Sequence, residues 1–248
     1  MREAVHYVPI ATSILALVFA GVLGRRYREK GGAHLAWWCA GMVVYAAGTI
    51  TESITTLAGW NEPVFKAWYI SGALLGGAPL AQGTAFLLLP RRTATRLAIA
   101  VATVVVIAAI AVMLSPIRGE LVEPHRLSGR VFGWRWVRGF SPFINLYAVI
   151  LLVGGAMLSA WRYRRRREAR HRFLGNVAIA IGGILPGIGG TFTRFGHVEV
   201  LYVTELIGLV VIWVGYRLNT RSPGEKTVAG MPSREYLVGS PSRSGDSQ

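Results

Sequence analysis

The sequence predicts an all-α integral membrane protein with seven transmembrane helices, an outer N-terminus and a cytoplasmic C-terminus. Apolar residues gather in seven blocks, most of them close to the length of about 20 residues that crosses roughly 30 Å of hydrocarbon. Basic residues flank these blocks on alternate sides, as expected where cytoplasmic loops retain Lys and Arg. The blocks occupy most of the chain and leave no room for a large soluble domain.

The expected helices form one transmembrane domain over residues 1–218, followed by a tail. They cover residues 6–24, 34–58, 64–89, 95–115, 141–163, 173–192 and 198–217. The first block is followed, not preceded, by the basic cluster 25–28, which favours an uncleaved helix over a signal peptide. Residues 219–248 are rich in Ser, Gly, Pro and Arg and poor in large apolar side chains, so we expect a disordered cytoplasmic tail.

Basic charge sets the expected orientation, because Lys and Arg resist translocation. It follows the first, third, fifth and seventh blocks and is nearly absent from the short opposite loops. The loop between the fourth and fifth blocks is the exception, with arginines at 118, 126, 130, 135 and 138. The densest run, which we expect to bind anionic lipid headgroups, is Arg162, Arg164, Arg165, Arg166 and Arg167.

The net charge of +15 therefore indicates membrane anchoring, not nucleic-acid binding, since no basic run accompanies a folded soluble module. The basic cytoplasmic loops also offer a docking surface for a protein partner. We expect the protein in the inner (plasma) membrane as a multi-pass protein.

A faint internal repeat links the first three blocks with the last three. Residues 48–51 (Gly-Thr-Ile-Thr) resemble 190–193 (Gly-Thr-Phe-Thr), and 26–28 (Arg-Tyr-Arg) match 162–164. A 3+1+3 arrangement of parallel repeats is typical of some transporters. The third and sixth blocks are also rich in glycine and contain Pro79 and Pro186. These residues favour close helix packing, or alternatively helix breaks that line a cavity.

The candidate ligand-binding residues are charged and hydroxyl groups that share the outer half of the membrane. Buried charge in a bilayer is costly and by default suggests function. The alternative is structural ion pairing within an interfacial aromatic belt. The set comprises Glu52, Lys66, Arg194 and Glu205, with Tyr69 and Tyr202 at similar depth.

An aromatic pattern marks the loop between the fourth and fifth blocks. Phe132, Trp134 and Trp136 alternate, which in an extended segment places three rings on one face. That face is expected to lie on the membrane surface, since Trp favours this depth, or alternatively to cover the polar pocket as a lid.

No catalytic, metal or cofactor site is predicted. The chain has a single cysteine, Cys39, and a single aspartate, Asp246. No histidine pair has the spacing of a metal site, no general base accompanies a nucleophile, and the last block lacks the lysine that a retinal Schiff base would need. We therefore expect the protein not to be an enzyme.

The second and third blocks carry a family resemblance. The segment 34–38 (His-Leu-Ala-Trp-Trp) opens one helix, Gly59-Trp60 follows, and Phe65-Lys66-Ala67-Trp68-Tyr69 opens the next, which ends at Leu89-Pro90-Arg91-Arg92. This part resembles a group of uncharacterised multi-spanning membrane proteins found widely in bacteria. The seven-span, N-out plan is also similar to the seven-helix sensory regions that precede histidine kinase domains. No kinase domain is expected here, so that resemblance implies signalling through a partner.

Together these features predict a membrane-embedded sensory or ligand-binding protein that takes a small or lipidic ligand from the outer side. The alternatives are a small secondary transporter with the 3+1+3 repeat, or a structural subunit of a larger membrane complex.

Overall fold

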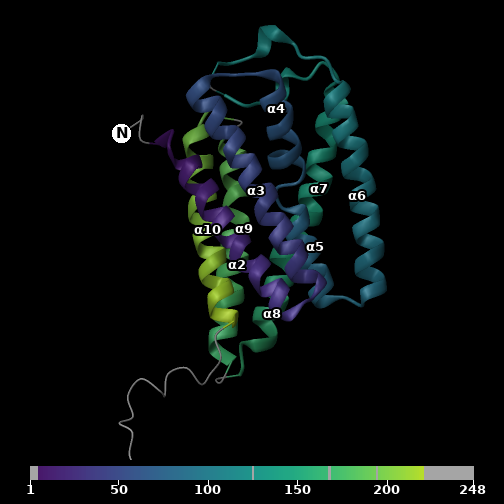
Figure 1. The fold of residues 1–248 in the computed structure, drawn as a ribbon, viewed down its shortest axis with the longest axis vertical. Helices are drawn as coiled ribbons and strands as arrows, with labels where there is room; N and C mark the ends of the chain where they lie inside the picture. Colours follow the sequence, from purple (N-terminus) through teal and green to yellow (C-terminus); the bar gives the residue numbers. More distant parts are fainter. Residues whose placement is uncertain (1–4, 125, 167–168, 194, 221–248) are drawn as a thin grey trace, which may run out of the picture.

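The fold is a bundle of long helices capped at one end by an irregular segment (Figure 1). A computed structural model describes residues 5–124, 126–166, 169–193 and 195–220. It is 85% helical, and the described residues form no strand beyond two isolated bridges. The predicted all-α membrane fold is confirmed, because six helical segments are long and apolar enough to cross a membrane, with Arg135–Tyr163 counted as one continuous segment.

The helices follow the expected order. They are α2 (Val8–Lys30), α3 (Ala33–Ala58), α4 (Glu62–Trp68), the π-helical η1 (Tyr69–Leu74), α5 (Ala78–Leu88), α6 (Arg91–Leu114), α7 (Phe140–Ala148), the π-helical η5 (Val149–Val153), α8 (Gly154–Tyr163), α9 (Arg170–Thr193) and α10 (Val198–Thr220). Between α6 and α7 lie three short 3-10 turns, η2 (Gly119–Leu121), η3 (Gly129–Val131) and η4 (Arg135–Gly139).

Two expected boundaries need correction. The first helix continues to Lys30 rather than ending near residue 24, because the basic cluster after the apolar block is helical as well. The last helix continues through Asn219 and Thr220, which were expected to begin the tail. The rest of the expected tail, 221–248, lies outside the described residues.

The third expected helix, 64–89, is not continuous. It bends between η1 and α5, where the Gly76 N–H bonds the Gly72 carbonyl at 3.1 Å. A Cβ on Gly76 would lie 2.5 Å from that same oxygen, so the bend requires glycine. Pro79 stands in the first turn of α5, where its missing N–H costs nothing. Pro186, by contrast, lies inside an unbroken α9.

The break is stabilised from a neighbouring helix. The carbonyl of Ala73 accepts hydrogen bonds from Ser141 Oγ at 2.8 Å and from Asn145 Nδ2 at 3.2 Å, both in α7. Backbone groups freed inside a bilayer must find such internal partners. The packing of α7 against η1 and α5 therefore keeps the interruption in place.

The helices pack in two sets of three with α6 at the edge. α2 packs on α3, and α3 on α5; correspondingly, α8 packs on α9, and α9 on α10. The sets meet where α2 contacts α10 and where α5 contacts α7 and η5. The start of α2 and the end of α10 lie at opposite ends of the bundle (Figure 1).

Glycines bring α9 and α10 into backbone contact. A Cβ on Gly182 would lie 2.6 Å from the Gly208 carbonyl oxygen, and one on Gly208 would lie 2.8 Å from that of Gly182. Gly175 and Gly215 face each other in the same way. Such close approach provides the van der Waals contact that holds helices together in lipid.

We predict that Gly182→Ala lowers the free energy of unfolding by about 1–3 kcal/mol, because overpacking forces the two backbones apart. The thermal unfolding midpoint in detergent should fall accordingly. Gly21→Ala is the matched control, because Gly21 is an exposed helical glycine whose Cβ would meet nothing within 4 Å. Equal midpoints for the two variants would contradict the assignment of this contact.

Candidate functional site

A cavity of about 750 Å³ opens among the helices beneath the segment 115–139, which we call the roof. Its walls come from α3, α4, η1, α5, α7, η5, α9 and α10. No described residue of α2 or α6 lines it. The volume lies in the range of small-molecule sites, roughly 300–1,000 Å³.

Small residues leave this space open. Gly187 and Gly190 of α9 line the cavity, and a Cβ on either would meet nothing within 4 Å. Glycine is the residue that lets a ligand approach backbone directly. The remaining glycines of the transmembrane wall are Gly48, Gly72, Gly76, Gly77 and Gly183.

Glu52 projects from α3 and is only 3% exposed. Its Oε1 accepts a hydrogen bond of 2.9 Å from the indole N–H of Trp68, whereas its Oε2 is buried without a partner. A buried carboxylate oxygen without a donor is costly. Glu52 is therefore held in position on one side and left unsatisfied on the other.

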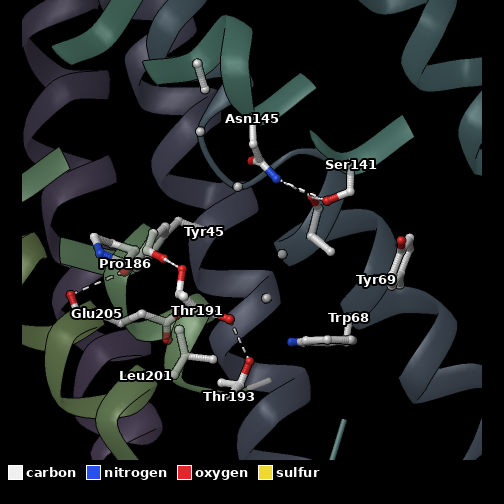
Figure 2. A pocket seen from close by; sticks show the side chains of 18 of the residues that line it. Tyr45, Trp68, Tyr69, Ser141, Asn145, Pro186, Thr191, Thr193, Leu201 and Glu205 are labelled. Atoms are coloured by element: carbon white, nitrogen blue, oxygen red, sulfur yellow. Dashed lines mark hydrogen bonds between the residues drawn. The ribbon is translucent and has the colours of Figure 1, made fainter. Parts of the chain in front are cut away.

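Glu205 of α10 meets Glu52 across the cavity. The two carboxyl groups lie near each other in the wall of the same cavity, and Glu205 Oε2 also lacks a partner. Tyr45 fixes this part of α10, since its hydroxyl donates to the Glu205 backbone carbonyl at 3.2 Å. Figure 2 shows Glu205 beside Tyr45, with the Trp68 ring reaching in from α4.

The chemistry of this pair follows from its geometry. Two carboxylates that lie near each other out of water repel each other unless one takes up a proton or a cation binds between them. In the described part of the chain the ion pairs are Lys66–Glu62 and Arg126–Glu123, so no cation there neutralises Glu52 or Glu205. The pair can hold a proton, or its carboxylate oxygens can accept hydrogen bonds from a cationic ligand.

The roof is folded back on itself and latched to α9. An antiparallel bridge joins Ile117 to Phe132. The guanidinium of Arg126 contacts Glu123 at 3.1 Å and donates to the Thr193 carbonyl at 2.6 Å. The roof residues that line the cavity are Arg126, Leu127, Ser128, Gly129, Arg130, Arg138 and Gly139.

The expected placement of the three roof rings on one face of an extended segment is wrong. Phe132 is fully buried, while Trp134 and Trp136 are 39% and 58% exposed and stack on each other at 5.9 Å between ring centroids. The 3-10 turns replace the extended backbone that alternation requires. Phe132 packs on Phe65 and Tyr69, with ring centroids 5.0 and 4.8 Å away, so the roof covers the cavity.

Three of the six predicted ligand-binding residues meet at the cavity: Glu52, Tyr69 and Glu205. Tyr202 is buried nearby and hydrogen-bonds Thr56 at 3.1 Å. Lys66 faces elsewhere, because it pairs with Glu62 at 2.7 Å and donates to the Met113 carbonyl at 2.9 Å. Arg194 lies outside the described residues.

Sequence reasoning did not identify Tyr45, or the arginines of the roof, as part of the site. The helical spacing offered a signal: Tyr45, Gly48 and Glu52 are three and four residues apart, and so share one face of α3. The roof arginines had only a negative signal, namely that they break the charge alternation. Contact with a ligand would be one reason for arginines in the roof, where the charge alternation predicts none.

No protein-family model, no curated protein and no solved structure matches this chain. The site is therefore interpreted from its own residues. Among the described residues, no group of three or more His, Cys, Asp or Glu is placed to hold a metal ion.

We predict that Phe132→Ala loosens the roof. The free energy of unfolding should fall by about 3–5 kcal/mol, because a buried ring is removed. Trypsin should then cut the roof arginines faster and the unfolding midpoint should fall. Trp136→Ala, which removes an exposed ring from the same segment, should change neither much. Faster cleavage in Trp136→Ala than in Phe132→Ala would overturn this assignment.

Proposed function

We propose that the chain crosses the membrane seven times, with the third crossing made by α4, η1 and α5, the N-terminus outside and the C-terminus in the cytoplasm. The support is the opposite placement of the start of α2 and the end of α10 (Figure 1), together with the gathering of basic charge at the end away from the roof. That charge comprises Arg25, Arg26, Arg28, Lys30, Arg91, Arg92, Arg162, Arg164, Arg165, Arg166 and Arg217. We propose the inner (plasma) membrane as its location.

Within that membrane, we propose a sensory or ligand-binding protein that takes a small or lipidic ligand from the outer side. The observation that supports this most is the cavity, which brings Glu52 and Glu205 together with unpartnered oxygens beneath the roof. Among the described residues neither acid has a basic partner. The function is binding rather than catalysis.

The cytoplasmic end would pass the signal on. α3 and α10 carry the two glutamates, and α10 also reaches that end, where Arg26 donates to the Tyr216 hydroxyl at 3.4 Å. The exposed Arg162, Arg164, Arg165 and Arg166 are proposed to bind anionic headgroups and to form part of a surface for a protein partner. Arg167 belongs to the same run but lies outside the described residues.

We predict that native mass spectrometry of the gently extracted protein shows a bound small molecule. In Gly187→Trp the fraction of protein that carries this molecule should fall roughly tenfold or more, because the indole fills the cavity. Gly21→Trp is the matched control, because its side chain also enters open space but lies away from the cavity. Equal loading of both variants would reject this cavity as the site. A bare chain with a stoichiometric protein partner would favour the structural-subunit alternative.

A secondary transporter is the second candidate, because the two halves of the bundle present equivalent residues to the cavity. Tyr45, Gly48 and Thr49 line it from α3, and Gly187, Gly190 and Thr191 line it from α9. The two sets have the same spacing, which the sequence repeat 48–51 and 190–193 predicts. The corresponding packing of the two three-helix sets supports the same 3+1+3 arrangement, and the interrupted helix beside the cavity is typical of transporters.

The transporter proposal predicts flux. Proteoliposomes loaded with a metabolite mixture should lose specific compounds within minutes, with those losses reduced by Gly187→Trp and unchanged by Gly21→Trp. Mass spectrometry of the external medium checks this. Binding without any flux difference between wild type and Gly187→Trp would leave the sensory function and reject transport.

A further inference from the structure

We propose that the ligand of this cavity is a zwitterion, with a cationic nitrogen bound by Glu52 and Glu205 and an anionic group bound by Arg130 and Arg138. This inference rests on the proposed ligand-binding function and deepens it. The cavity is lined by glutamates of α3 and α10, by the aromatic rings of Trp68 and Tyr69, and by arginines of the roof. Each step of the argument concerns one of these three regions.

The acidic end lies within the helices. Glu52 Oε2 and Glu205 Oε2 are both buried and both lack a hydrogen-bond donor. Trp68 holds Glu52 from the opposite side at 2.9 Å, so the free oxygens are left for another group. A protonated amine supplies up to three N–H donors and the charge that a buried carboxyl pair needs.

The middle of the wall is aromatic. Trp68 and Tyr69 follow each other in the chain, and their ring centroids are 6.0 Å apart in an edge-on arrangement. Trp and Tyr faces attract cations as well as apolar groups. These rings therefore suit the carbon skeleton of a ligand whose nitrogen lies near Glu52.

The basic end is the roof. The side chain of Arg138 passes close to Gly129 and Tyr69: a Cβ on Gly129 would lie 3.7 Å from Arg138 Nε and 3.0 Å from Tyr69 Cε2. Arg126 is occupied by Glu123 and Thr193, which leaves Arg130 and Arg138 to face a ligand. Guanidinium groups bind carboxylate and phosphate through paired N–H donors.

A single charge would satisfy only half of this arrangement. An anion bound to the roof leaves the two buried glutamates without a cation, and a cation bound to the glutamates makes no use of the exposed arginines of the roof. A ligand with both charges gains attraction at each end, and its own charges lower the desolvation cost of the site. Charge complementarity thus favours an amine and an anion on one molecule.

Two sources carry this chemistry: a free amino-acid-like solute, and the headgroup of an aminophospholipid. The amine and the carboxylate or phosphate are common to both. Acyl chains distinguish them, since a lipid must reach the cavity from the bilayer whereas a solute must pass the roof.

The test measures binding of matched compounds to the full chain in a non-ionic detergent. Aminohexanoate, hexanoate and hexylamine share a carbon chain and carry both charges, the anion alone or the cation alone. The series is repeated with chains of four and eight carbons to match the unknown span. We expect at least one zwitterion to bind roughly tenfold or more tighter than both of its single-charge analogues, as expected for an added charge-assisted hydrogen bond.

The variants assign each end. Glu205→Gln should reduce the binding of the zwitterion to that of the anion, and Arg138→Gln should reduce it to that of the amine. Glu199→Gln and Arg135→Gln are matched controls, because both residues are exposed, lie on the same elements and do not line the cavity. No zwitterion advantage at any chain length, or equal effects of Glu205→Gln and Glu199→Gln, would overturn the proposal.

The lipid arm uses phosphatidylethanolamine, phosphatidylglycerol and glycerophosphoethanolamine. Preference for phosphatidylethanolamine over both others identifies a lipid ligand, and tight binding of glycerophosphoethanolamine or an amino acid identifies a solute. If the zwitterion advantage is missing while Gly187→Trp still removes a natively bound mass, the zwitterion inference fails and the binding function stands. If wild type carries no mass and binds no probe, both fail.

Discussion

The bilayer offers no water to hydrogen-bond with a free backbone or a buried charge, and the rest of the structure depends on this constraint. The clearest departure from a regular helix in the described chain is stabilised by partners within the protein. The interruption between η1 and α5 occurs at glycines and is held by Ser141 and Asn145. It also lies against the cavity, where irregular backbone is tolerated. The remaining polar groups without partners, above all on Glu52 and Glu205, therefore stand out as exceptions that need a ligand or a proton.

The helices on the two sides of the cavity are held together by two different kinds of contact. α9 and α10 touch backbone to backbone through Gly182 and Gly208, which makes that pair a rigid unit. On the other side of the cavity, α3 and α5 are joined by Trp38, whose indole donates to the Leu80 carbonyl at 3.1 Å. The cavity lies where the two sets do not close on each other. The two sets contact each other where α2 meets α10 and where α5 meets α7 and η5, so a change in the width of the cavity would require repacking at these contacts.

The sequence predicted the helical membrane fold because that fold follows from one-dimensional signals. Block length set the helices, and the rarity of charge singled out Glu52 and Glu205. It did not predict the partners. Lys66 was expected at the same depth as Glu52, but its side chain faces away from the cavity and pairs with Glu62 one turn earlier in α4. The expected depth alone could not distinguish these two partners. Phe132 was misplaced because period-two alternation presumes an extended chain, whereas short turns rotate successive side chains differently. The broken third helix was foreseen only as an alternative, since Pro79 and Pro186 look alike in sequence and differ only in their packing.

The roof links access to recognition. Its fold depends on Phe132 being buried against Phe65 and Tyr69, and Tyr69 in turn lies in the cavity wall between Arg138 and Trp68. A ligand that contacts Tyr69 or Arg138 would therefore contact residues that also hold the roof in place over the cavity. Because the Arg126 latch to Thr193 ties the roof to α9, movement of the roof would also be felt at the helix pair that carries Glu205. Under the proposed function, a ligand bound to both the roof arginines and the buried glutamates would act on one continuous set of packed groups. Occupancy of the cavity could in that way alter the far end of α10.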